Sequence, residues 1–161
     1  MREVSAGPAS PLHFYREHVA PNVPVVFRNA TSHWPASKKW QDPCYFRRRL
    51  GKTEVTVSVT PNGYADAVTK DGKHFAMPHE ERMTMGAFLD ELERPESERK
   101  GVHYIQKQNS NLTDEFREVL GDVEELEWAR EAFGKEPDAV NFWMGDGRAV
   151  TSSEWRFDMF F

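Results

Sequence analysis

The side chains most able to do chemistry are six histidines and one cysteine, and their spacing forms no familiar catalytic or metal-binding motif. The histidines are His13, His18, His33, His74, His79 and His103. No two of them stand in the His-x-x-x-His spacing that places two imidazoles on one helix face, and a single cysteine supplies no Cys pair for zinc. His74 and His79 flank a proline-containing loop, which favours solvated or structural histidines. The histidines therefore predict no metal site.

Motifs for nucleophilic catalysis and for phosphate binding are also absent from the sequence. It contains no Gly-x-Ser-x-Gly, no Walker loop and no Rossmann glycine fingerprint. Cys44 lies in a predicted helix without a histidine nearby in the sequence, so we interpret it as a core residue rather than a nucleophile. The local chemistry alone predicts no catalytic residue.

Length and composition favour one globular domain. The chain has 161 residues, 18.6 kDa and 39% hydrophobic residues, enough for a sizeable core. A net charge of -5 gives no electrostatic reason to bind nucleic acid or an anionic membrane. The chain has no apolar run near the roughly 18 residues of a membrane span and no secretory signal. The single cysteine suits a reducing compartment, so we expect cytoplasm, nucleus or both.

Two strands are predicted in the middle of the chain, and the second carries Tyr104 and Gln106. Residues 54–60 alternate valines with polar residues, which is typical of a strand with one buried face. In the strand that starts at Val102, Tyr104 and Gln106 share a face because side chains alternate with a period of two. Helices are predicted at residues 11–19, 42–50, 84–93, from 113, and 126–133.

The last part of the chain predicts a strand, a reversal and a returning strand. An apolar run covers residues 139–144, Gly145-Asp-Gly147 follows, and a second β-prone segment begins at Arg148. Strands early, middle and late with helices between them indicate a mixed α/β (α+β) fold. The sheet order is not visible from the sequence.

Four stretches in one order carry a family resemblance. They are residues 11–16 with 21–29, 53–68, 101–112, and 137–145 with 149–152. Together they resemble the JmjC-domain proteins of the cupin superfamily, and in particular small JmjC proteins that hydroxylate a protein lysine. The resemblance implies a double-stranded β-helix with flanking helices, of which this chain is the N-terminal portion with an incomplete barrel. We expect a loose N-terminus (1–10), a JmjC/cupin-like portion (11–152) and a divergent tail (153–161).

The resemblance also implies cofactors and site residues. The family's dioxygenases use Fe(II) and 2-oxoglutarate to hydroxylate a lysine. Tyr104 and Thr151 match the tyrosine and threonine whose hydroxyls bind 2-oxoglutarate. Gln106, on the strand face of Tyr104, would line the substrate pocket. A dicarboxylate in a dry barrel needs fixed hydroxyl donors, and an inward-pointing tyrosine supplies one.

The sequence departs from the family at the iron ligands. Members carry a His-x-Asp pair that begins three residues after the threonine, and here those positions hold Glu154 and Arg156. A guanidinium stays protonated and repels a dication, so Arg156 cannot be a ligand. The family's distal histidine and 2-oxoglutarate lysine would lie beyond Phe161. We therefore expect no metal ligand and no tight cofactor binding in this chain, which we interpret as a truncated isoform or gene-model product.

Two functional hypotheses follow. In the first, the chain is part of an Fe(II)/2-oxoglutarate-dependent protein lysyl hydroxylase and is inactive as it stands. In the second, it is a non-catalytic binding or regulatory fragment that keeps partner contacts of the full-length protein. By resemblance, the partners would be a protein substrate such as a GTPase, or a second JmjC subunit in a homodimer. No peptidase activity is predicted, because no nucleophile or complete metal site is visible.

Overall fold

The computed structural model describes residues 2–4, 7–65, 67–69, 71–108 and 110–150. These residues divide into two compact units, one drawn from the described residues of 2–41 and 121–138 and the other from those of 42–120 and 139–150. Among the helices of the described residues, none has the length and apolar character of a membrane span. Each unit has its own packing.

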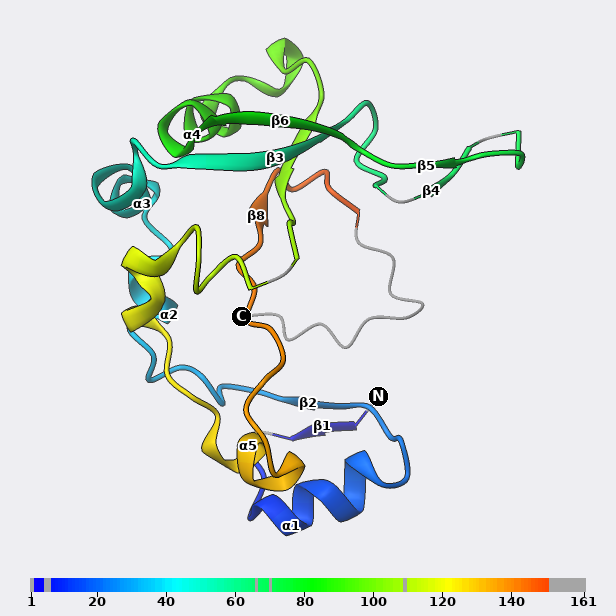
Figure 1. The fold of residues 1–161 in the computed structure, drawn as a ribbon, viewed down its shortest axis with the longest axis vertical. Coiled ribbons are helices and arrows are strands. Elements are labelled where there is room, and N and C mark those ends of the chain that lie inside the picture. Colours follow the sequence, from blue (N-terminus) through cyan, green and yellow to red (C-terminus); the bar gives the residue numbers. More distant parts are fainter. Residues whose placement is uncertain (1, 5–6, 66, 70, 109, 151–161) are drawn as a thin grey trace. The chain divides into compact units, whose positions relative to one another are not determined.

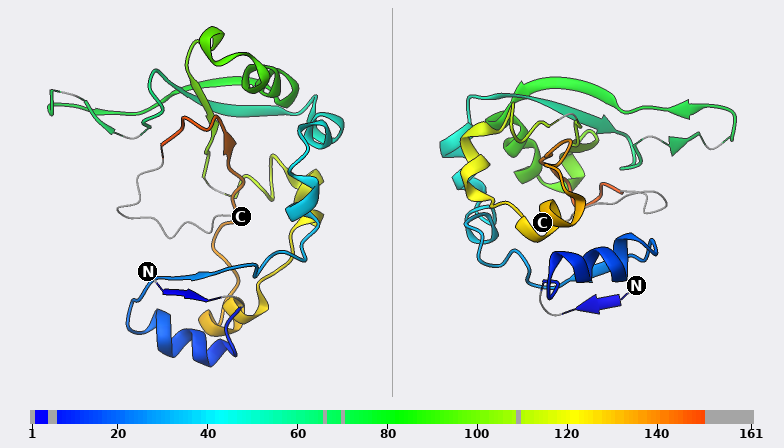
Figure 2. Two further views of the ribbon diagram at one scale, coloured as in Figure 1. Left: turned by 180° about the vertical axis from the view of Figure 1, so that it is seen from behind. Right: turned by 60° about the horizontal axis from the view of Figure 1, so that its bottom comes forward.

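The first unit combines short helices with one pair of strands. Its elements are β1 (Arg2–Val4), α1 (Pro11–Phe14) continued by a π-helical turn (Tyr15–Val19), β2 (Val25–Phe27), α2 (Ala36–Lys39) and α5 (Glu127–Phe133). β1 and β2 pair in parallel, and Figure 2 shows α1 alongside this pair. The cap predicted for the first helix is confirmed, since the Ser10 hydroxyl accepts a hydrogen bond from the His13 N–H at 3.1 Å. Gly134, at a φ of 66°, ends α5 in the left-handed conformation.

Aromatic contacts hold α1, β2 and α5 together. The ring of Trp128 lies 4.9 Å from that of Phe14 and 5.4 Å from that of Phe27, in edge-on arrangements typical of aromatic pairs. The apolar run Val25–Phe27 thus forms a strand that packs against both helices. The sequence pattern predicts no element in residues 1–9, but the structure has β1 there, because its backbone partners lie in β2 and leave no local signal.

The second unit is built on a four-stranded antiparallel sheet in the order β6-β3-β7-β8. Its strands are β3 (Glu54–Thr60), β6 (His79–Thr84), β7 (Val102–Ile105) and β8 (Met144–Gly145). A separate hairpin, β4 (Ala67–Val68) with β5 (Phe75–Ala76), extends beyond the ends of β3 and β6 (Figure 1). The strand predicted at 54–60 is confirmed with its boundaries.

Helices α3 (Pro43–Leu50) and α4 (Met85–Glu93) pack with this sheet around one core. Both begin as predicted, with Asp42 accepting from the Cys44 N–H at 2.9 Å and Thr84 accepting from the Ala87 N–H at 3.2 Å. The largest fully buried side chains, all in this unit, are Phe46, Leu50, Val55, Val57, Met85, Phe88, Leu89, Ile105, Leu112, Phe116 and Val119. Short 3₁₀ helices cover Glu96–Glu98 and Arg117–Asp122.

Three predictions of local structure were wrong. Cys44 is exposed, not part of the core, because it faces away from the buried side of α3. Thr113 does not cap a helix, since its hydroxyl donates to the Ser110 carbonyl oxygen at 2.9 Å within a run of turns. The strand predicted at 139–144 is reduced to Met144–Gly145. Before it, the Asn111 side chain, and not a neighbouring strand, forms hydrogen bonds with the backbone of Phe142.

The buried face of β3 also differs from the prediction in its last residues. Val55 and Val57 are buried as expected, but Ser58 and Thr60 are then buried in place of Val59. The reason is that β3 is an inner strand whose end is covered by the loop that follows it and by Gln106. The mixed α/β fold class is confirmed, and the described strands close no barrel.

Candidate functional site

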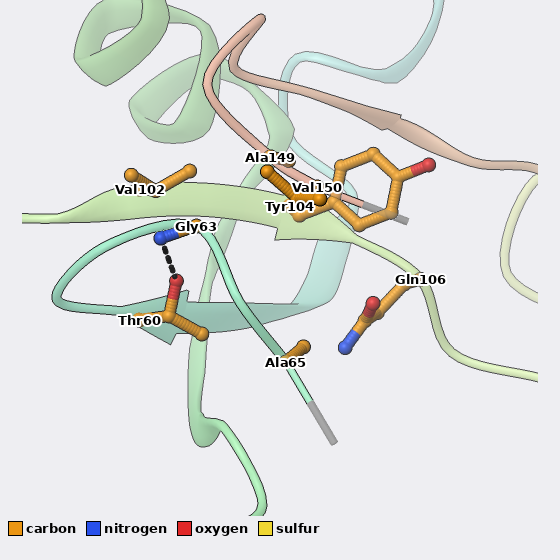
Figure 3. A pocket seen from close by; sticks show the side chains of 8 residues that line it. All are labelled: Thr60, Gly63, Ala65, Val102, Tyr104, Gln106, Ala149 and Val150. Carbon is orange, nitrogen blue, oxygen red and sulfur yellow. Dashed lines mark hydrogen bonds between the residues drawn. The ribbon is translucent and has the colours of Figure 1, made fainter. Parts of the chain in front are cut away.

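A small pocket in the second unit brings together two of the residues singled out by the sequence. It lies where the end of β3, the loop after it, β7 and residues 149–150 meet (Figure 3). Its described lining residues are Thr60, Gly63, Ala65, Val102, Tyr104, Gln106, Ala149 and Val150. Tyr104, in β7, and Gln106, one residue beyond its end, thus line one pocket.

Tyr104 occupies the middle of the sheet. It pairs across the sheet with Ser58 of β3 and with Gly145 of β8, and its side chain is half-buried. Within the described part of the chain, no hydrogen bond joins its hydroxyl to another residue. The hydroxyl is therefore available to donate a hydrogen bond to a ligand oxygen.

Gln106 is fixed by the neighbouring strand. Its side-chain nitrogen Nε2 donates to the hydroxyl oxygen of Ser58 at 3.2 Å, and Ser58 is buried. This bond holds the amide beside the tyrosine. The other predicted contact, Thr151, lies outside the described residues. Its neighbour Val150 lines the pocket and donates its backbone N–H to the Gly63 carbonyl oxygen at 2.9 Å.

The loop after β3 forms one wall of the pocket and needs a glycine. Gly63 has a φ of +87°, which side chains rarely adopt, and a Cβ there would lie 2.1 Å from the Arg148 carbonyl oxygen. Its N–H donates to the Thr60 hydroxyl oxygen at 2.9 Å (Figure 3). The two chain segments therefore approach each other more closely than any other residue would allow.

A buried carboxylate anchors the segment that leads to the lining residues Ala149 and Val150. Asp146, with 3% of its side chain exposed, accepts hydrogen bonds from Arg148 at 2.7 Å and from Arg99 at 2.8 Å. Its own N–H donates to the His103 carbonyl oxygen, and Arg148 also donates to the Gly101 carbonyl oxygen at 3.0 Å. The Arg148 guanidinium, helped by its backbone N–H and by Arg99, holds the pKa of Asp146 well below its usual range against the opposing effect of burial.

Sequence reasoning misses Asp146 and Gly145 as parts of the site, because it places both in a simple turn between two strands. The partner of Asp146 at Arg99 is distant in the sequence, so only the fold reveals the ion pair. The one local signal is the spacing of Asp146 and Arg148, which allows the backbone and side-chain bonds between them.

The side chains around the pocket do not fit iron. In the described residues, no three His, Cys, Asp or Glu side chains gather closely enough to hold a metal ion. His103 is buried in β7, His18 is buried in the other unit, and His74 and His79 are exposed. The positions that match the family's iron pair, Glu154 and Arg156, lie outside the described residues, and a guanidinium is no ligand. No described residue that lines the pocket carries a positive charge.

Comparison with known proteins decides the family. The profile of the cupin-like domain matches residues 11–159, which is most of the chain. This chain belongs to the cupin-like domain family. The match continues past Ser152, where the resemblance noted in the sequence ends.

Curated relatives identify the cupin-like chain as similar to JmjC proteins. It is 54% identical over 146 residues to the human bifunctional peptidase and (3S)-lysyl hydroxylase JMJD7. This alignment covers 90% of this chain and 45% of the human protein. It is 42% identical to the lysine-specific demethylase JMJ32 of Arabidopsis thaliana, covering 89% of this chain and 42% of the relative. It is 37% identical to JmjC domain-containing protein E of Dictyostelium discoideum, and that alignment covers 88% of this chain and 43% of the relative. The chain thus spans less than half the length of these relatives, and the JmjC resemblance is confirmed.

Proposed function

We propose that this chain supplies one wall of the 2-oxoglutarate pocket of a JmjC Fe(II)/2-oxoglutarate-dependent protein lysyl hydroxylase. The observation that carries the proposal is that Tyr104 and Gln106 line one pocket with Val150, the residue before Thr151. The similarity to a human lysyl hydroxylase supports lysine as the target. The JmjC-like portion that we propose comprises residues 11–152, with 1–10 before it and a tail at 153–161.

The roles of the residues follow from their chemistry. The Tyr104 hydroxyl would donate a hydrogen bond to one carboxylate oxygen of 2-oxoglutarate, and the Thr151 hydroxyl would donate another. Gln106, held by Ser58, would line the side of the pocket that faces the substrate. When bound, 2-oxoglutarate would supply the two electrons that oxygen activation requires and would leave as succinate and CO2.

The pocket as described favours weak binding of the dicarboxylate. A carboxylate loses much of its hydration on entering a pocket, and a cation usually compensates for that loss. The described lining residues are neutral, so hydroxyl and amide donors are the compensation that they offer. We therefore propose binding of 2-oxoglutarate in the millimolar range rather than tight binding.

We propose that the chain as it stands does not turn over 2-oxoglutarate. A facial triad needs two histidines and one carboxylate, and the chain has Glu154 and Arg156 at the positions of its first two ligands. Purified protein is expected to release no succinate in the presence of Fe(II), ascorbate and lysine-containing peptides. The double variant Glu154→His with Arg156→Asp is expected to bind Fe(II) at least tenfold more tightly than the parent chain.

The result that would overturn this part of the proposal is succinate release, or stoichiometric Fe(II) binding, by the unmodified chain. A calorimetric Fe(II) titration under anaerobic conditions measures the stoichiometry directly. The variant Glu154→Gln, which keeps Arg156, is the matched control for the double variant and is expected to bind no more Fe(II) than the parent.

The second candidate function is a non-catalytic binding module, which the arginine at an iron position favours. Its partners would be a protein substrate, with GTPases as one class, or a full-length JmjC subunit in a homodimer, in cytoplasm or nucleus. Affinity capture with this chain and with a full-length relative, compared side by side, tests the idea. A shared set of partners supports it, and the absence of any shared partner contradicts it.

A further inference from the structure

Tyr104 and Gly145 form a cross-strand pair in which the ring occupies the space of a missing side chain. The two residues stand opposite each other in the register of β7 and β8. A Cβ built on Gly145 would lie 1.9 Å from Cδ2 of the Tyr104 ring and 2.9 Å from its Cε2. Ordinary contacts begin near 3.4 Å, so the ring is about 1.5 Å too close to tolerate a methyl group.

The backbone at this position does not itself require glycine. Gly63, Gly72 and Gly134 have positive φ angles, and Gly145 does not. Any residue could adopt the backbone conformation of Gly145. The demand for glycine therefore comes from the ring of Tyr104 and, to a smaller extent, from the His103 carbonyl oxygen at 2.9 Å.

The pairing of an aromatic ring with a glycine on an outer strand has a known physical benefit. Glycine weakens a strand because it has no side chain to pack, and an aromatic ring lying across it restores the lost contact. β8 is the outer strand of the described sheet and contains two residues. The Tyr104 ring thus packs at a defined position on β8.

β8 cannot withdraw from the ring. The residue after Gly145, Asp146, donates its N–H to the His103 carbonyl oxygen at 3.0 Å and is bound by two arginines, Arg99 and Arg148. These contacts fix the backbone of β8 against β7. A side chain at position 145 would therefore displace mainly the ring, because its Cβ would lie 1.9 Å from the ring and 2.9 Å from the His103 carbonyl oxygen.

From this geometry we infer that Gly145 is a positioning residue, which sets where the Tyr104 ring and its hydroxyl lie by leaving room for the ring on β8. The identity of the ligand that this hydroxyl binds rests on the proposed function, whereas the contact between the Tyr104 ring and Gly145 is independent of it. A ring moved by about 1.5 Å would carry its hydroxyl out of reach of a ligand oxygen that it contacts at about 2.7 Å. One methyl group at position 145 is thus expected to remove the contribution of Tyr104 to binding.

The test follows the tyrosine ring directly. Protein labelled with ¹³C in its tyrosine rings gives signals from four tyrosines, and Tyr104→Phe identifies that of Tyr104. Gly145→Ala is expected to move the Tyr104 ring signals and to leave those of Tyr15 and Tyr45 in place. Gly147→Ala is the matched control, because a Cβ at Gly147 would meet nothing within 4 Å, and it is expected to move none of them. Unmoved Tyr104 signals in Gly145→Ala, or equal movement in Gly147→Ala, would overturn the inference.

A double-mutant cycle provides a second readout. Gly145→Ala is expected to lower the urea midpoint in the natural background and to lower it much less in the Tyr104→Ala background, where the ring is gone. Equal shifts in the two backgrounds would show that Gly145 serves the backbone alone and would overturn the inference.

Titration of the same labelled samples with 2-oxoglutarate separates this inference from the proposed function. If Gly145→Ala moves the ring while no sample responds to 2-oxoglutarate, the positioning role stands and the proposed ligand is wrong. If the natural chain responds and Gly145→Ala responds at least tenfold more weakly, both stand. If Gly145→Ala moves the ring and binds 2-oxoglutarate as the natural chain does, the positioning of the hydroxyl for this ligand is wrong.

Discussion

Gly63 shows at the level of one residue how closely two chain segments approach each other beside the pocket. Its φ is positive, and a Cβ at this position would lie 2.1 Å from the Arg148 carbonyl oxygen, so both features oppose a side chain. Gly63→Ala is expected to lower the free energy of unfolding by about 3 kcal/mol, because strain at a positive φ and a backbone clash add together. Urea denaturation measures the loss.

Gly72 offers the matched control for Gly63. Its φ is +71°, but a Cβ there would meet nothing within 4 Å. Gly72→Ala therefore carries the strain of the positive φ without the clash, and a loss of about 1 kcal/mol is expected. Equal losses in the two variants would contradict the close approach of Gly63 to Arg148.

The stability that the Asp146 carboxylate contributes depends on pH. A carboxylate whose pKa is depressed in the folded state contributes stability above its unfolded pKa of about 3.9, and that stability disappears as the pH falls toward the lower folded value. Asp146→Asn is expected to cost about 3 kcal/mol at pH 7, since it leaves two arginines without their buried partner. The free energy of unfolding of the variant should also change less than that of the natural chain as the pH falls from 5 through 3, because the variant has no carboxylate to protonate.

Asp138→Asn is the control for the pH series. Asp138 has 84% of its side chain exposed and pairs with Lys135, so its loss is expected to cost less than about 0.5 kcal/mol. Urea denaturation at several pH values compares the three proteins. A parallel pH dependence in the natural chain and in Asp146→Asn would refute the role of Asp146.

At the scale of elements, Asn111 explains why residues 139–143 do not form the predicted strand. Its buried amide donates to the Phe142 carbonyl oxygen at 2.9 Å and accepts from the Phe142 N–H at 2.6 Å, in the way that a neighbouring strand would. Asn111→Ala is expected to cost about 3 kcal/mol, because it removes both partners from buried backbone groups. Asn62→Ala, which removes one exposed bond to the Tyr64 N–H, should cost less than about 1 kcal/mol in the same denaturation experiment. Similar losses of stability in the two variants would contradict the idea that the Asn111 side chain takes the place of a neighbouring strand.

The elements that can be predicted well from the sequence are those with local signals. The caps at Ser10, Asp42 and Thr84 bind backbone groups two or three residues away, so a short stretch of sequence contains both partners. Strand β6 is not predicted because its side chains are mostly exposed and polar, and an outer strand of this kind lacks an apolar pattern.

The same distinction applies to the pocket. Tyr104 and Gln106 stand two residues apart, so the sequence suggests that they lie on one side of the chain, although β7 ends at Ile105 and Gln106 is held by Ser58. The contacts of Asp146 with Arg99 and of Asn111 with Phe142 join residues 47 and 31 positions apart, and no local pattern reveals them. Sequence similarity supplies the family, and the fold supplies the supports of the site.

At the scale of the whole molecule, the chain is expected to unfold with weak cooperativity. Its described residues form two compact units with separate cores, a setting in which a single two-state transition is not guaranteed. The sequence also ends in an apolar segment, with Phe157, Met159 and Phe161 at alternating positions, which predicts self-association and poor solubility. Light scattering and urea denaturation test this, and a sharp two-state transition from a monodisperse monomer would show that the tail completes the fold.

The central claim is that Tyr104 belongs to a pocket for 2-oxoglutarate, and saturation-transfer NMR with the natural chain and Tyr104→Phe tests it most directly. The substitution removes one hydroxyl and leaves the ring on Gly145, so folding should be unchanged. The natural chain is expected to transfer saturation to 2-oxoglutarate at millimolar concentration, and Tyr104→Phe is expected to lose most of that signal, since one hydrogen bond to a charged group contributes about 1.5–3 kcal/mol. Equal signals from the two proteins, or none from the natural chain, would contradict the claim.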